Sequence, residues 1–263
     1  MRSNRSLGLL AAVLMVLALW NLWNSISAWN APTGRIDAAV KHEVQAAVKH
    51  QVQDDRAKAA ETVYGNSPER TKVLGLIRKI RAESDMLQAD YEAFQIYMAV
   101  KRTRKVPGDV AEVGVYRGGT AKLICEVRGD VSLHLFDTFE GIPEVGKLDS
   151  TVKKGQYAAG LEGVKQYLKD CPNTYFYQGW FPATAGPVKN KKFSFVHLDV
   201  DTYKSTLDSL KFFYPRMSKG GVIISHDYVW FEGVRKAVDE FFADKPDPVF
   251  ELAGSQCFIV RLR

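Results

Sequence analysis

The stretch Glu112-Val113-Gly114-Val115-Tyr116-Arg117-Gly118-Gly119-Thr120 decides the fold. It starts inside an apolar run, residues 110–115, that predicts a strand, and it leads into residues 120–127, which predict a helix. Glycines in such a turn let backbone N–H groups approach an anionic ligand at the positive end of the helix. The stretch therefore predicts a ligand-binding loop in an α/β domain. The alternative is a glycine turn that packing alone requires.

The spacing of these glycines limits the kind of ligand. It is G-x-x-x-G-G rather than the G-x-G-x-x-G of dinucleotide-binding loops, and no G-K-[ST] of a Walker loop follows it. Both features disfavour a dehydrogenase or an ATPase. Asp137 ends the second predicted strand, 23 residues after Gly114, where an acidic side chain accepts hydrogen bonds from both ribose hydroxyls of a nucleoside. We therefore expect a nucleoside-containing cofactor, with an Asp137 that only caps a turn as the alternative.

Helical stretches and short apolar strands alternate on both sides of this loop, which is typical of a doubly wound, mostly parallel sheet. The last two predicted strands are separated by only four residues, 253–256, which implies an antiparallel hairpin at the edge of the sheet. Strands are predicted at 110–115, 131–136, 174–177, 193–198, 221–225, 249–252 and 257–261, and helices at 69–81, 90–102, 120–127, 161–169, 205–214 and 233–242.

Acidic side chains and a histidine follow two of the predicted strands. Asp199 and Asp201 come after the fourth strand, and His226 and Asp227 after the fifth. Because parallel strands lie about 4.8 Å apart, these side chains meet at the carboxyl edge of the sheet, where ligands bind in this architecture. The alternative is that they cap turns and helices.

This group predicts a divalent-cation site formed by Asp199, His226 and Asp227. Oxygen ligands suit Mg²⁺, whereas an imidazole shifts the preference toward Mn²⁺ or another transition metal. A cation there would stabilise an alkoxide formed from an acceptor hydroxyl, and Asp199 is also the candidate general base. His134 and His197 lie inside apolar strands and are predicted to be interior residues rather than catalysts.

Composition points to a globular protein with no nucleic-acid partner. The chain has 263 residues, 46% of them apolar, and a net charge of +6 that comes from basic residues scattered along the sequence. The three cysteines, Cys125, Cys171 and Cys257, show no C-x-x-C spacing and no zinc-ligand pattern. We expect them to be reduced, mostly buried thiols.

The amino-terminal segment predicts a single-pass membrane anchor over residues 1–30. Residues 7–23 are uncharged and leucine-rich, follow Arg2 and Arg5, and approach the hydrocarbon thickness of a bilayer as a helix. A cleaved signal peptide is the alternative, although residues 25–31 fit a cleavage site poorly. The flanking charges leave open the side of the membrane on which the rest of the chain lies.

Residues 31–66 predict a helical stem between the anchor and the folded domain. Residues 38–45 and 46–53 are near-duplicates, AAVKHEVQ and AAVKHQVQ, that place valines four residues apart on one helical stripe. Self-association through this stripe would make the chain a homo-oligomer. The cluster Gly65-Asn66-Ser67-Pro68 then marks the domain boundary, which gives a folded domain of residues 67–263.

Six sequence strings, taken together, resemble the macrocin O-methyltransferase family. They are GDVAEVGVYRGGTAK (108–122), LFDTFEGIP (135–143), GWFPAT (179–184), HLDVDTYKSTLDSL (197–210), GGVIISHDY (220–228) and GVRKAVDEFF (233–242). The resemblance implies a class I methyltransferase that uses S-adenosylmethionine and a divalent metal to methylate a sugar hydroxyl, typically on a glycosylated small molecule.

The resemblance also assigns residues. Its glycine loop holds the methionine part of the cofactor, which implies a cofactor-binding set of Glu112, Gly114, Tyr116, Arg117, Gly118, Gly119, Thr120 and Asp137. Asp199 and Asp227 resemble the metal ligands of the family. His226 stands where the family has its other metal-binding aspartate, so the identity of the metal, and whether one binds, stays open.

Three functions follow as hypotheses. The first is an O-methyltransferase acting on a hydroxyl of a sugar or glycosylated acceptor, for which a surface glycan or a lipid-linked saccharide also qualifies. The second is a membrane-tethered module that binds a nucleoside or glycan without catalysis, prompted by His226 in a ligand position. The third is a scaffold assembled through the stem.

Overall fold

The computed structural model describes residues 67–263. The predicted anchor, residues 1–30, and the predicted stem, residues 31–66, lie outside the described residues and stay predictions. Within residues 67–263, no helix combines the length and the apolar character that crossing a membrane requires.

Seven strands form one sheet in the order β3-β2-β1-β4-β5-β7-β6. Neighbours from β3 to β5 run parallel, whereas β7 is antiparallel to both β5 and β6. The predicted mostly parallel sheet with an antiparallel hairpin at one edge is confirmed. The strands are β1 (Asp109–Val113), β2 (Leu133–Asp137), β3 (Thr174–Gln178), β4 (Phe193–Leu198), β5 (Met217–Ser225), β6 (Val249–Glu251) and β7 (Cys257–Val260).

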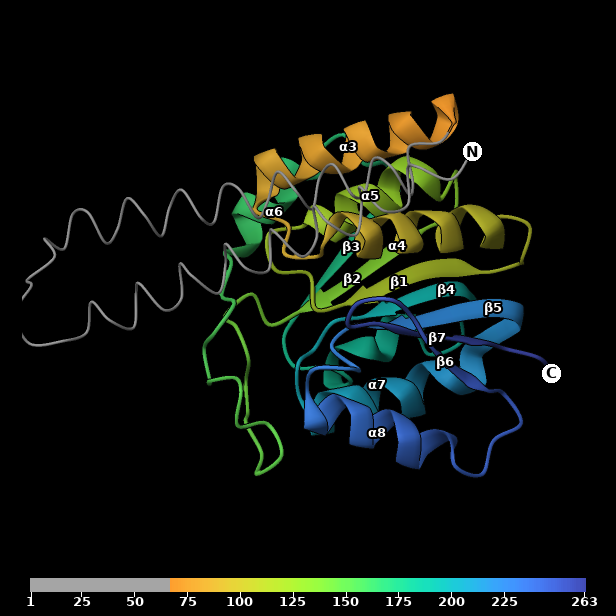
Figure 1. Cartoon of the computed structure of the whole chain (residues 1–263). Helices are drawn as coiled ribbons and strands as arrows, with labels where there is room; N and C mark the ends of the chain where they lie inside the picture. The colour runs from red at the N-terminus through yellow and green to blue at the C-terminus, as the bar shows by residue number, and fades with distance from the viewer. Residues whose placement is uncertain (1–66) are drawn as a thin grey trace, which may run out of the picture. The chain divides into compact units, whose positions relative to one another are not determined.

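Helices cover both faces of this sheet (Figure 1). On one face α4, α5 and α6 pack over the strands, with α3 outside α4 and α5, and on the other face lie α7 and α8. Because both faces are covered, every residue of the central strand β4 is buried, including the polar Ser194 and His197. The helices are α3 (Pro68–Ser84), α4 (Asp90–Thr103), α5 (Gly119–Val127), α6 (Leu161–Tyr167), α7 (Tyr203–Phe213) and α8 (Glu232–Phe242), with short 3₁₀ helices η1 (Ala183–Val188) and η2 (Tyr214–Arg216).

Local sequence sets several of these boundaries. Ser67 and Thr202 precede α3 and α7 in extended conformation, and their side chains accept hydrogen bonds from the backbone N–H groups of Arg70 and Ser205. The start of β5 differs from the prediction: it lies at Met217, not at residue 221, because Met217 pairs with Phe193 of β4. The polar and glycine residues 218–221 conceal that extension in the sequence.

Two of the three cysteines contradict the prediction of reduced thiols. Cys125 of α5 and Cys171, which follows α6, form a disulfide across a Cα–Cα distance of 6.0 Å. The pairing arises because α5 and α6 lie on the same face of the sheet, a proximity that a separation of 46 residues does not reveal. Cys257 is a buried free thiol, as predicted.

Candidate active site

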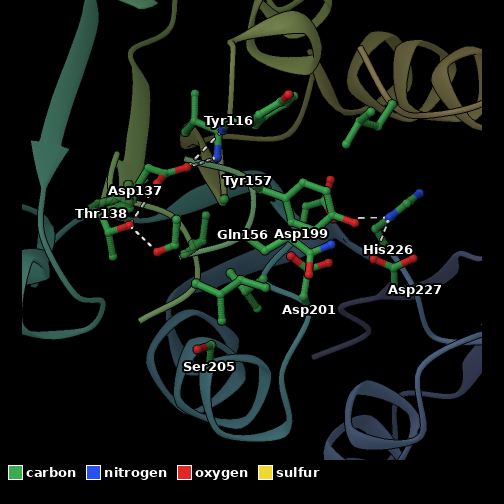
Figure 2. Close-up of a pocket in the computed structure, with 18 of the residues that line it drawn as sticks. Tyr116, Asp137, Thr138, Gln156, Tyr157, Asp199, Asp201, Ser205, His226 and Asp227 are labelled. Atoms are coloured by element: carbon green, nitrogen blue, oxygen red, sulfur yellow. Dashed lines mark hydrogen bonds and ion pairs between the residues drawn. The ribbon is translucent and has the colours of Figure 1, made fainter. Parts of the chain in front are cut away.

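A cavity of about 400 Å³ opens where the carboxyl ends of β1, β2, β4 and β5 meet. Figure 2 shows Tyr116 and Asp137 on one side of it and His226 and Asp227 on the other. Among the predicted site residues, those that line the cavity are Gly114, Tyr116, Gly119, Thr120, Asp137, Asp199, His226 and Asp227. The fold therefore brings the glycine loop and the acidic cluster to one space, as the positions of the strand ends predicted.

Asp137 holds the glycine loop in place. Its Oδ2 accepts hydrogen bonds from the backbone N–H groups of Val115 and Tyr116, at 2.6 and 2.9 Å, and its Oδ1 accepts one from Phe139 at 2.7 Å. Each carboxylate oxygen has two lone pairs, so Oδ1 keeps acceptor capacity toward the cavity. The residue caps a turn and also lies where a ribose is expected, so the two interpretations of Asp137 are compatible.

Gly114 allows the loop to pass close to β4. It has a φ of +85°, and a Cβ at this position would overlap the carbonyl oxygen of Asp199. The backbone conformation and the contact both require glycine. This close approach joins the loop after β1 directly to the acidic residues after β4.

Three residues of the predicted cofactor set do not line the cavity. The Glu112 carboxylate lies under α4 and α5 and contacts Nδ1 of His197 at 3.0 Å, and Arg117 donates to Asp85. Gly118 precedes α5 in a left-handed conformation. Contact of these three residues with a cofactor stays a prediction.

The two interior histidines are buried and partnered, as predicted. His134 lies between Tyr177 and Asp109, at 3.0 and 2.9 Å, and His197 contacts Glu112. Both are at most 1% exposed. They stabilise the interior of the sheet and do not reach the cavity.

Glu112 predicts a pH dependence of stability. Burial raises the pKa of its carboxyl to about 7, although His197 opposes the shift. Below the ordinary pKa of 4.5 both states hold this proton, and between that value and about 7 only the native state does, so stability is lost as pH rises through that window. The loss amounts to about 3 kcal/mol at most. Urea unfolding at pH 5 and pH 8 should show this decline in the wild type and a smaller one in Glu112→Gln, and equal declines would contradict it.

The acidic cluster surrounds one imidazole. Nδ1 of His226 lies 3.2 Å from Oδ1 of Asp199 and 3.1 Å from Oδ2 of Asp227, and one ligand atom from each of these three residues falls within 4.8 Å of the others. Burial alone would lower the pKa of His226, but the neighbouring carboxylates outweigh it and raise that pKa well above its usual range.

Asp201 completes the polar end of the cavity. Burial and the nearby carboxylates of Asp199 and Asp227 raise the pKa of Asp201 well above its usual range. Asp201 and Asp227 both have φ values near +60°, a conformation that costs energy in a residue with a side chain. Such conformations are common at ligand-binding sites, where packing holds them in place.

Two residues of the site come from the region before α4 and from its first turn, and sequence reasoning missed both. Nε2 of Gln88 donates to Oδ2 of Asp199 at 2.5 Å, and Oε1 of Gln88 accepts from the Thr120 hydroxyl at 2.8 Å. Glu92 is 1% exposed, and its Oε2 lies 3.6 Å from Nε2 of His226. In the sequence, Gln88 and Glu92 are only polar residues in or beside a predicted helix with one buried face. That pattern does not show which strand end the helix covers.

The cluster fits a divalent cation. Both ring nitrogens of His226 are buried and make no well-formed hydrogen bond, although carboxylate oxygens surround them. Nδ1 and two carboxylates facing a common point form a mixed nitrogen and oxygen donor set, which suits a transition metal such as Mn²⁺ better than Mg²⁺.

Aromatic side chains line the outer part of the cavity. Tyr157 lies between β2 and α6, Trp180 follows β3, and Trp230 lies between β5 and α8. Trp180 and Trp230 are 40% and 58% exposed. Tyr203 does not line the cavity, and its hydroxyl donates to Glu240.

The sheet order, the glycine loop and a cavity at the carboxyl ends of the strands define a Rossmann-like methyltransferase fold. The solved structure of the O-methyltransferase NovP is similar, with a TM-score of 0.59 and 28% identity over 65% of this chain and 79% of that one. The chain belongs to the macrocin-O-methyltransferase (TylF) family, whose sequence profile matches residues 27–252. That match begins well before residue 67 and so includes the segment predicted to be a stem.

Two relatives of similar sequence are named as O-methyltransferases, and the name of the first includes a rhamnosyl group. The 8-demethyl-8-(2,3-dimethoxy-alpha-L-rhamnosyl)-tetracenomycin-C 4'-O-methyltransferase of Streptomyces olivaceus is 33% identical over 58% of this chain and 66% of its own length. The demethyldecarbamoylnovobiocin O-methyltransferase of Streptomyces niveus is 32% identical over 52% of this chain and 59% of its own length. The chain therefore spans less than two thirds of the length of these relatives.

Proposed function

We propose that this protein is an S-adenosylmethionine-dependent O-methyltransferase that methylates a hydroxyl of a sugar or glycosylated acceptor. The observation that carries the proposal is that one cavity holds both a glycine loop, positioned by Asp137, and the acidic cluster that includes Asp199. A nucleoside-binding module would need the first of these features, but not the second.

One side of the cavity would bind the cofactor, and the other side would bind and deprotonate the acceptor hydroxyl. Asp137 and the loop from Gly114 to Thr120 would bind the nucleoside and the amino-acid part of the cofactor, and the positive end of α5 would attract its anionic carboxylate. Asp199 accepts the proton of the acceptor hydroxyl. The oxygen then forms a bond to the methyl carbon while the sulfur–carbon bond breaks and its electron pair stays on sulfur, which leaves S-adenosylhomocysteine.

Asp199, His226 and Asp227 would hold a divalent ion beside this hydroxyl. When bound, the ion stabilises the negative charge that develops on the acceptor oxygen. By fixing the position of the ion, the three residues would also orient the acceptor hydroxyl beside it. Gln88 orients Asp199 through its hydrogen bond. Removal of divalent ions with a chelator should therefore lower kcat by at least about tenfold, and added Mn²⁺ should restore it better than Mg²⁺.

The acceptor is proposed to be a saccharide for two reasons. One of the relatives named above acts on a compound whose name includes a rhamnosyl group. The exposed rings of Trp180 and Trp230 at the cavity lie where they can stack on a sugar ring. These observations support a glycoside and do not choose among sugars.

The proposal is tested by methyl transfer from labelled S-adenosylmethionine to aryl glycosides, beginning with an aryl α-L-rhamnoside. We expect a product that carries one methyl ether on the sugar, identified by mass spectrometry and by its fragmentation. Cofactor binding without transfer to any glycoside in a broad panel, with Mn²⁺ present, would instead favour a binding module without catalysis.

A further inference from the structure

Glu92 occupies a position that no role in the proposed reaction explains. It lies in the first turn of α4, is 1% exposed and does not line the cavity. Its Oε1 accepts hydrogen bonds from the backbone N–H and the hydroxyl of Ser255, each at 2.8 Å, and its Oε2 accepts one from the backbone N–H of Ala89 at 2.8 Å. A carboxylate that accepts three hydrogen bonds in the interior is held in one orientation.

The remaining side of this carboxylate faces His226. Oε2 of Glu92 lies 3.6 Å from Nε2 of His226, the ring nitrogen on the opposite side from Asp199 and Asp227. A cation between the two aspartates would take the place of the proton on Nδ1, and the ring would then keep its proton on Nε2. Glu92 is the acceptor on that side of the ring, so it favours the form of His226 that can bind an ion through Nδ1.

We propose that Glu92 is a positioning residue that orients His226 as a metal ligand and so sets the preference of the site for a transition metal over Mg²⁺. The inference rests on the metal assistance proposed above. Carboxylates that hold the second ring nitrogen of a ligating histidine typically change metal affinity by 10- to 100-fold, because they fix the ring and raise its basicity. His226 would give the site an imidazole nitrogen beside two carboxylates, so the orientation of its ring would affect which ion the site selects.

The test is ion binding by the full-length chain, independent of turnover. Free Mn²⁺ is measured by electron paramagnetic resonance, and Mg²⁺ by its competition for the bound Mn²⁺. We expect the wild type to bind Mn²⁺ at least about tenfold more tightly than Mg²⁺. Glu92→Gln should weaken Mn²⁺ binding by about tenfold while the Kd for S-adenosylmethionine stays within about twofold.

Two further variants separate positioning from stability. Ser255→Ala removes one hydrogen bond to Glu92 but leaves the carboxylate facing His226, so it should lower the melting temperature without changing Mn²⁺ affinity. His226→Asp replaces the imidazole with a carboxylate and should narrow the preference for Mn²⁺ over Mg²⁺ by at least about tenfold. This second variant tests the inference even where Glu92→Gln fails to fold.

Two results would overturn the inference. One is Mn²⁺ affinity in folded Glu92→Gln equal to that of the wild type, and the other is an unchanged preference between ions in His226→Asp. A wild type that transfers methyl groups but binds neither ion would also overturn it while leaving the methyltransferase proposal intact. If the wild type does not bind S-adenosylmethionine at all, the methyltransferase proposal itself is rejected.

Discussion

Replacing Asp199 with alanine is expected to lower kcat for methyl transfer by about 1,000-fold while the Kd for S-adenosylmethionine stays within about threefold. A positioned general base typically contributes between about 100- and 10,000-fold, and a metal ligand adds to the stabilisation of charge on the acceptor oxygen. Asp199 contacts Gln88 and His226 and lies across the cavity from Asp137, so its loss affects the reacting hydroxyl rather than the nucleoside. Single-turnover transfer measured at saturating cofactor separates these two effects.

Asp199→Asn is the matched variant for this prediction. It keeps the volume of the side chain and an oxygen that accepts the hydrogen bond from Gln88, but it has neither the charge nor the basicity of a carboxylate. We expect the same loss of kcat as in the alanine variant. Turnover within about threefold of the wild type in either variant would remove Asp199 from the mechanism.

Replacing Asp137 with alanine is expected to raise the Kd for S-adenosylmethionine by at least about 100-fold. A hydrogen bond to a charged group contributes about 1.5 to 3 kcal/mol, and a ribose hydroxyl is expected to donate to the acceptor site that remains on Oδ1. The backbone N–H groups of Val115 and Tyr116 also lose their acceptor, so the glycine loop loses the contact that positions it. Calorimetric titration of the cofactor into the full-length chain measures the effect.

Thr138→Val provides the control for Asp137. Thr138 also lines the cavity, but its hydroxyl donates to the carbonyl oxygen of Gly141 at 2.6 Å and serves the local turn. Its removal should change the Kd by no more than about threefold. A similar loss of affinity in both variants would mean that the segment after β2 acts only by its conformation and that Asp137 has no direct role in binding.

The sheet was predictable because its strands are short apolar runs separated by helical stretches. The sequence predicted that the side chains after the fourth and fifth strands, Asp199 and Asp227 among them, meet at one edge of the sheet, and the structure shows that Asp137 lines the same cavity. Residues at the ends of strands follow directly from strand order. This explains why most of the predicted cofactor and metal residues do line the cavity.

Site residues that come from the helices over the sheet, rather than from strand ends, were not predictable in the same way. Gln88 and Glu92 reach the site from the segment before α4 and from its first turn, and helical periodicity shows that a residue is buried but not which strand end lies under it. The partner of Glu112 was not predictable either. The register of β1 on β4 pairs Glu112 with His197, and strand ends alone do not show this register. The Cys125–Cys171 disulfide likewise depends on which helices are neighbours on one face.

Titration of S-adenosylmethionine into the full-length chain, with Mn²⁺ present and absent, tests whether the cavity binds this cofactor. We expect saturable binding of one cofactor molecule per chain, displaced by S-adenosylhomocysteine, in both the wild type and Asp199→Ala. No saturable binding by the folded wild type under either ion condition would contradict the assignment of the cavity to this cofactor, and the proposed methyl transfer with it.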